Sequence, residues 1–167
     1  MASHHAHRGV TLLELLLCLG LLALLAGLAA PGFQASLRAS AVRAATFEVA
    51  VGVQRTRADS ILSARPGLLC PADSAGNCLA AGSRASGWRA FLEDGPARVQ
   101  LGGQGLPRGI TLLATRSPIR FWPASFAASA GTLTICDERG IAPARAIVIS
   151  ATGRARLEQA APGACEA

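Results

Sequence analysis

The chain has 167 residues, a formal net charge of +6 and a sequence pI of about 10.2, which suits one globular domain plus a membrane segment. All 16 basic residues are arginines, and this balance attracts nucleic acid or anionic lipid without specifying either. The sequence contains no G-x-S-x-G, no H-E-x-x-H and no phosphate loop, which argues against the corresponding enzyme classes, and we expect no cofactor and no metal.

The N-terminal segment combines a long apolar run with one carboxylate. Leu15–Leu37 carries no charge and is long enough to span a membrane. Glu14 stands at its start, although a charge at the centre of a bilayer helix costs about 2.5–3.5 kcal/mol on insertion scales. A secretory signal peptide and a plain membrane anchor both leave Glu14 unexplained. The signal peptide also places Pro31 directly after its only small-residue cleavage site, "GLAA".

The segment "RGVTLLEL" resembles the prepilin leader of type IV pilins and type II secretion pseudopilins. The resemblance implies that a prepilin peptidase cuts between Gly9 and Val10, removes residues 1–9 and methylates the new N-terminus. It also implies that Glu14 pairs with the N-terminal amine of a neighbouring subunit in the filament, which makes a buried carboxylate tolerable. Pro31 then corresponds to a helix-kinking proline, and residues 10–33 form the transmembrane and filament-core helix. Val10 departs from the usual phenylalanine.

The next segment predicts a continuation of this helix. The pattern indicates one helix from about Thr11 to Ser63, ended by Arg65-Pro66-Gly67, whose second half packs on a sheet. Apolar or small residues recur at close to a 3.6-residue period, and the set is Phe33, Leu37, Ala41, Ala44, Phe47, Val51, Ala58, Ile61 and Leu62.

Short β-rich runs separated by Gly and Pro turns follow the helix. They are Trp88–Glu93, Arg98–Leu101, Ile110–Thr115, Ile119–Trp122, Thr132–Cys136, Arg145–Ser150 and Arg154–Glu158. A helix followed by consecutive strands predicts an α+β fold with an antiparallel sheet wrapped on the helix. We expect the aromatic residues Trp88, Phe91, Phe121, Trp122 and Phe126 to belong to the core.

Four of the five cysteines lie beyond the hydrophobic run, and an even number in an exported domain predicts two disulfides. Three pairings are possible. Cys70 and Cys78 bracket the turn-rich segment "CPADSAGNC", and Cys165 lies close enough to the end to fix the C-terminus. The spacing therefore favours Cys70–Cys78 and Cys136–Cys165.

The region "GTLTICDERGIAPARAIVISATGRARL", followed by a terminal cysteine, resembles the C-terminal part of the GspH/FimT family of minor pilins and pseudopilins. Together with the leader, the helix, and "CPADSAGNC" followed by "GW", the resemblance covers most of the chain. It implies a type IV pilin-like α+β fold, with a long N-terminal helix packed on an antiparallel β-sheet domain. Residues 34–167 then form a periplasmic head domain.

The segment "GRAR", Gly153 to Arg156, is the candidate binding motif. In an extended chain Arg154 and Arg156 point to the same side, roughly 6.5–7 Å apart, and arginine forks bind phosphate oxygens bidentately. The segment matches the G-R-x-R motif by which FimT-type pilins bind DNA during natural transformation. This resemblance implies that Arg154 and Arg156 contact phosphates and that Gly153 shapes the loop. Arg139 and Arg145 are candidates to extend the pair, on charge alone.

Two function classes therefore remain. The first is a binding module, a minor pilin that binds extracellular DNA without sequence preference. The second is structural, either a minor pilin that primes pilus assembly or an H pseudopilin of type II secretion. The resemblance implies major and minor pilins and the prepilin peptidase as partners. It places the chain in the bacterial inner membrane with a periplasmic head, and then in a type IV pilus at the cell surface.

Overall fold

The computed structural model describes residues 11–124, 126–140 and 142–166. Within these ranges it contains one helix, α1 (Leu12–Ser63), followed by strands that make up the rest of the fold. The strands are β1 (Gly67–Ala72), β2 (Gly87–Asp94), β3 (Ala97–Gly105), β4 (Ile110–Ala114), β5 (Ile119–Trp122), β6 (Ala127–Ala128), β7 (Gly131–Asp137), β8 (Arg145–Ile149) and β9 (Ala155–Gln159).

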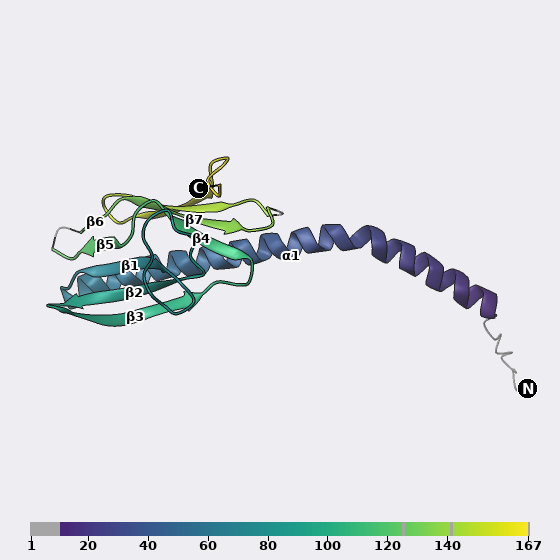
Figure 1. Cartoon of the computed structure of the whole chain (residues 1–167), viewed down its shortest axis with the longest axis horizontal. Coiled ribbons are helices and arrows are strands. Elements are labelled where there is room, and N and C mark those ends of the chain that lie inside the picture. The colour runs from purple at the N-terminus through teal and green to yellow at the C-terminus, as the bar shows by residue number, and fades with distance from the viewer. Residues whose placement is uncertain (1–10, 125, 141, 167) are drawn as a thin grey trace, which may run out of the picture. The chain divides into compact units, whose positions relative to one another are not determined.

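The chain divides after Ser36 into two compact units. In the first unit α1 is an exposed, apolar helix that continues through Pro31. Among the described residues α1 is the one helix long and apolar enough to span a membrane, with a mean hydropathy of 2.5 over its best window. In the second unit the rest of α1 packs with the strands (Figure 1).

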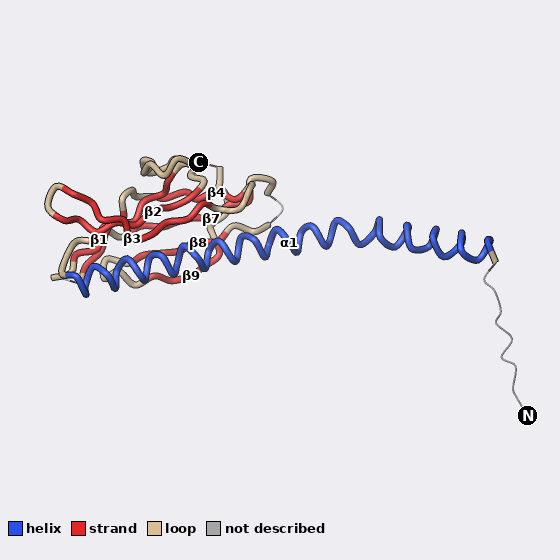
Figure 2. Tube along the Cα trace, turned by 90° about the horizontal axis from the view of Figure 1, so that it is seen from below, coloured by secondary structure: helices blue, strands red, loops and turns tan. Residues whose placement is uncertain are grey.

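The strands of the second unit form two antiparallel sheets. One has the order β3-β2-β1-β5-β6 and the other the order β4-β7-β8-β9. Figure 2 shows β8 and β9 beside α1. The predicted class, a long helix on antiparallel β-structure, is confirmed, but the strands divide between two sheets where a single sheet was expected.

The predicted strands correspond to β2, β3, β4, β5, β7, β8 and β9. The prediction omitted β1, in which Pro71 lacks the backbone N–H of a normal ladder residue, and β6, which is only two residues long. It also ended β3 too early. The structure continues β3 through Gly102 and Gly103 to Gly105, although glycines are typical of turns.

The buried face of α1 differs from the predicted one. The helix buries Val42, Ala45, Val49 and Val53 in the core, whereas Phe47 is 65% exposed. Val51 and Leu62, also expected to pack on a sheet, are exposed as well.

Small residues explain this choice of face. A methyl group added to Gly52 would lie 2.4 Å from the Trp88 ring, and one added to Gly67 at the start of β1 would lie 2.9 Å from the Thr56 carbonyl oxygen. Helix and sheet therefore approach closely along the face that includes Gly52 and Thr56. A larger side chain on that face would push them apart.

The aromatic residues divide between core and surface. Trp88 and Phe121 are buried as predicted, and Phe91 is half-buried. Trp122 and Phe126 were also expected in the core, but they are 39% and 58% exposed. Trp122 ends β5 and Phe126 directly precedes β6, so both lie where the chain reverses at the surface.

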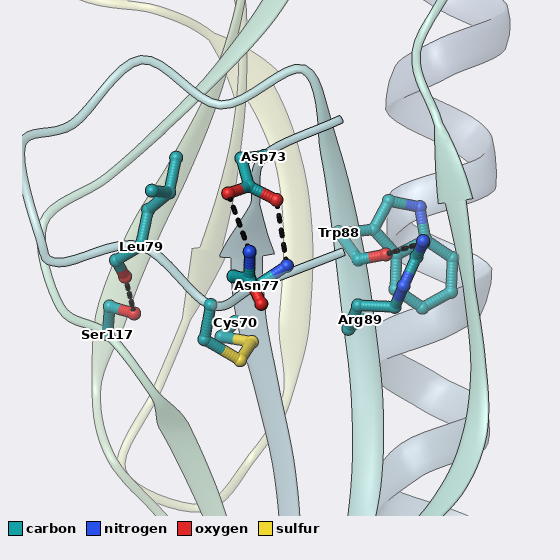
Figure 3. Close-up of a disulfide and its surroundings, with 8 residues drawn as sticks. Cys70, Asp73, Asn77, Leu79, Trp88, Arg89 and Ser117 are labelled. Atoms are coloured by element: carbon teal, nitrogen blue, oxygen red, sulfur yellow. Dashed lines mark hydrogen bonds between the residues drawn. A yellow bond between two sulfur atoms is a disulfide. The ribbon is translucent and has the colours of Figure 1, made fainter. Parts of the chain in front are cut away.

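Both disulfides favoured by the spacing are present in the structure. Cys70 of β1 and Cys78 have Cα atoms 5.5 Å apart, and their disulfide closes the turn that directly follows β1 (Figure 3). Within it, Asp73 accepts hydrogen bonds from the backbone N–H and the side-chain amide of Asn77, at 2.8 and 3.0 Å (Figure 3). These bonds, the backbone one first, lower the pKa of the Asp73 carboxyl.

The second disulfide joins Cys136 of β7 to Cys165, with Cα atoms 5.9 Å apart. Arg84 adds a hydrogen bond from Nη2 to the carbonyl oxygen of Cys165 at 2.6 Å. The segment after β9 is therefore fixed to the domain by one covalent bond and one charge-assisted hydrogen bond.

Candidate nucleic-acid interface

The candidate motif lies at the turn between β8 and β9. Gly153 donates its backbone N–H to the Ser150 carbonyl at 2.8 Å, and Ser150 donates to the Arg154 carbonyl at 3.0 Å. Gly153 has a φ of +73°, in the left-handed region. This is the geometry of a three-residue hairpin loop in which a turn is followed by a left-handed residue, a position that favours glycine.

The two motif arginines are exposed on either side of Ala155. Arg154 directly precedes β9, and Arg156 lies within it, opposite Val148 of β8. Because β9 is the edge of its sheet, its outer side is open to an approaching molecule. Within the described ranges Arg154 forms no ion pair, whereas Arg156 Nε lies 3.9 Å from Glu158 Oε1. Strand alternation thus brings a cation and an anion to the same side, which lowers the local positive charge.

A third arginine reaches this turn from α1. A methyl group added to Gly153 would lie 2.9 Å from Arg57 Nε and 3.1 Å from Arg57 Cδ. Arg57 is half-buried, and its guanidinium stem therefore occupies the space above the glycine. The sequence does not predict this contact, because nothing local connects residue 57 to residue 153.

Arg139 and Arg145 lie at the other end of the β8–β9 hairpin. Arg145 is paired with Gln159, four residues along β8 from the Ile149–Ala155 pair, which corresponds to roughly 13 Å. Arg139 lies in the loop between β7 and β8, where Glu138 donates its backbone N–H to the Gly109 carbonyl. The structure therefore does not bring these two arginines together with Arg154 at the turn.

Arg139 instead lies near Arg38, at the start of the part of α1 that packs with the sheets. Arg38 Nη1 donates to the Arg108 carbonyl at 3.0 Å, next to Gly109. Arg38 and Arg57 are separated by roughly 28 Å along the helix axis, at 1.5 Å per residue. The structure thus places Arg139 away from Arg57 and the β8–β9 turn.

The start of α1 has its own local geometry. The backbone N–H of Glu14 donates to Thr11 Oγ1 at 3.2 Å, and Leu15 donates to the Thr11 carbonyl at 3.1 Å. Thr11 is therefore the N-cap of the helix, and Glu14 is the third helical residue. Glu14 is exposed in the single chain. Gly9 and Val10, the predicted cleavage site, lie outside the described residues.

The model of the family described as type II transport protein GspH matches residues 45–153, about two thirds of the chain. The chain belongs to the GspH family. The comparison with curated protein sequences found no match. The GspH match includes Gly153 and ends there, so Arg154 and Arg156 lie just beyond the matched residues.

Solved structures show the same fold. The type IV minor pilin FimU of Pseudomonas aeruginosa is similar in two crystal forms, at 16% identity, with TM-scores of 0.53 and 0.54. The aligned part is 70% of this chain in both forms, and 91% or 87% of the FimU chain. The minor pseudopilin EpsH of the Vibrio cholerae type 2 secretion system is 11% identical, with a TM-score of 0.52, over 69% of this chain and 96% of that one.

GspH-family membership gives the chain its general role. It is a minor pilin or pseudopilin of a type IV pilus or a type II secretion system, and such proteins are structural components and not enzymes. The family implies other pilins and the prepilin peptidase as partners. The apolar first part of α1 is consistent with anchoring in the inner membrane before assembly.

Proposed function

We propose that this GspH-family chain is a minor type IV pilin of the FimT type, which binds extracellular DNA through the β8–β9 turn for uptake in natural transformation. The observation that carries the proposal is the exposure of Arg154 and Arg156 at an edge strand, directly after a glycine-dependent turn. Guanidinium forks at this position can reach phosphate oxygens without displacing any part of the fold.

The expected interaction is weak and independent of DNA sequence. Phosphate contacts carry no sequence information, and two of them imply a slope of about −1.8 in a plot of log affinity against log salt concentration. Several subunits in one pilus would raise the effective affinity through avidity. The ion pair between Arg156 and Glu158 weakens the contribution of one of the two cations.

The second candidate is a purely structural role, in priming a pilus or in a type II secretion pseudopilus. The folds of FimU and EpsH do not separate this role from DNA binding, because a pilin with either role would have the same helix and sheets. A structural subunit does not require two exposed arginines at one turn. DNA binding therefore separates the two candidates.

The test is a DNA titration of the full-length chain in a nonionic detergent, with a short fluorescent duplex at several salt concentrations. We expect weak, salt-sensitive binding that is lost in Arg154→Gln/Arg156→Gln. The matched control is Arg139→Gln/Arg145→Gln, which removes the same charge from the other end of the hairpin. Circular dichroism checks that each variant is folded.

A further variant makes the same test sharper. Glu158→Gln releases Arg156 from its ion pair and should strengthen binding by roughly twofold, since an exposed pair is worth about 0.2–1 kcal/mol. Equal binding by the wild type and the double mutant at the turn, or no binding by the wild type, would contradict the proposal and favour the structural role.

The proposal extends to the N-terminus. Cleavage between Gly9 and Val10 would release the mature chain, and Glu14 would pair with the N-terminal amine of its neighbour in the filament. The exposure of Glu14 in the single chain supports this role, because its carboxylate is then available to another subunit. The chain would pass from the inner membrane, with a periplasmic head, into a pilus at the cell surface.

A further inference from the structure

We infer that Arg57 of α1 is a third phosphate-binding residue of the β8–β9 turn, outside the G-R-x-R motif; this inference rests on the proposed DNA binding. The contact between Arg57 and Gly153 carries it. Residue 153 lies at the one position of the hairpin where a glycine is required by its φ of +73°, and Arg57 fills the space that a side chain would take.

The position of Arg57 is set by two packed elements. Its neighbour Thr56 is buried, and a methyl group added to Gly67 of β1 would lie 2.9 Å from the Thr56 carbonyl oxygen, so this turn of α1 is packed closely against the sheet. On the other side, the β8–β9 turn is held by the Ala128 N–H, which donates to the Ala151 carbonyl at 2.7 Å. The guanidinium of Arg57 is thus held beside the residue that precedes Arg154.

The charge of Arg57 is available to a ligand. Within the described ranges no carboxylate forms an ion pair with Arg57, whereas the nearby acid Asp59 pairs with Arg55 at 3.7 Å. Arg57 is half-buried, so part of its surface reaches solvent. A cation that is partly ordered by packing loses less side-chain entropy when it binds a phosphate than a fully free one.

Three cations from two elements form a more specific surface than two on one strand. Arg154 and Arg156 alternate with Ala155, which packs against the core, so they project from the outer face of β9, whereas Arg57 reaches the same turn from the helix side. A phosphate chain that passes around the turn, from the outer face of β9 to the helix side, would contact cations on both sides of Gly153. Glycine at residue 153 serves both requirements, since it permits the turn and admits the Arg57 stem.

The test measures the salt dependence of DNA binding by the full-length chain in nonionic detergent, with the same fluorescent duplex. Arg57→Gln should reduce the magnitude of the log–log salt slope by about 0.9, the value of one phosphate contact. Arg57→Gln should also weaken DNA binding by roughly two- to fivefold at low salt, which is the fold-change in affinity expected when one exposed ion pair is lost. Arg57→Lys keeps the charge and should keep the slope.

Two further variants separate charge from packing. Arg57→Met keeps an unbranched apolar stem against Gly153 and should lose the same increment of slope as Arg57→Gln. Arg43→Gln removes an exposed arginine from the same helix about 21 Å away along its axis, and its slope should match the wild type. The thermal unfolding of each variant shows that its fold is retained.

The outcomes distinguish this inference from the proposal on which it rests. If the wild type binds DNA and Arg154→Gln/Arg156→Gln does not, but Arg57→Gln and Arg57→Met keep the wild-type slope, the role of Arg57 is overturned and the proposed function stands. If the wild type does not bind DNA at any salt concentration tested, both are overturned.

Discussion

At the scale of single residues, Gly153 decides how the motif is presented. Its positive φ sets the turn, and its missing side chain leaves room for Arg57. The resemblance implies that Gly153 shapes the loop, and its φ of +73° supplies a physical reason for glycine at this position. The contribution of Arg57 could not be foreseen, because the two residues meet only through the tertiary packing of α1 with the β8–β9 turn.

Gly153→Ala should lower both stability and DNA affinity. A left-handed conformation costs an L-residue about 1–2 kcal/mol, and the added methyl group also displaces Arg57. The matched control is Gly95→Ala, which has a φ of +58° but no atom within 4 Å of the added methyl group. Thermal unfolding should show a loss for both variants, and the DNA titration a loss for Gly153→Ala alone. An unchanged affinity for Gly153→Ala would contradict the account of this turn.

At the scale of elements, the strands were more predictable than the face of the helix. Alternation and turn residues located β5 at its observed bounds and most other strands to within a residue or two. Helical periodicity located α1 but not its buried side. The buried face of α1 is selected by Gly52 and Thr56, which permit close approach to Trp88 and β1. Such a fit depends on the shapes of residues distant in the sequence, which a hydropathy pattern does not describe.

The two disulfides should contribute unequally to stability. In the chain-entropy model the bridge between Cys136 and Cys165, with a sequence separation of 29, is worth about 3.5 kcal/mol, and the one between Cys70 and Cys78, with a separation of 8, about 2.5 kcal/mol. Urea unfolding followed by tryptophan fluorescence should therefore show the larger loss for Cys136→Ser/Cys165→Ser. A larger loss for Cys70→Ser/Cys78→Ser would show that strain or residual structure outweighs loop length.

At the scale of the whole molecule, the residues of the proposed assembly role and those of the proposed DNA binding lie in different units of the chain. The apolar part of α1 carries Glu14, whereas Arg57, Arg154 and Arg156 lie in the second unit with the sheets. The family and the α+β class could be predicted from the leader-like segment, the cysteine spacing and the strand pattern. The choice between FimT-type DNA binding and a structural role could not, since both use the same fold.

Glu14→Ala should prevent incorporation into pili while the head domain remains folded. The removed carboxylate would no longer pair with the amine of a neighbouring subunit, although the Thr11 cap can still accept a hydrogen bond from the backbone of residue 14. The measurement is the amount of the protein in sheared pili against the amount in the inner membrane. Glu14→Gln, which retains a polar side chain without charge, is the control for size; normal incorporation of either variant would contradict the predicted pairing.

The contact between Arg57 and Gly153 has a consequence for the evolution of the family. Positions 57 and 153 are far apart in the chain, yet a side chain at residue 153 would force the Arg57 side chain to move. Relatives in which residue 153 is no longer glycine should therefore have a short residue at position 57, and the two changes should appear together on the same branches. In a lineage that keeps glycine at residue 153 but loses both motif arginines, position 57 could vary freely, because the glycine leaves room for any side chain there.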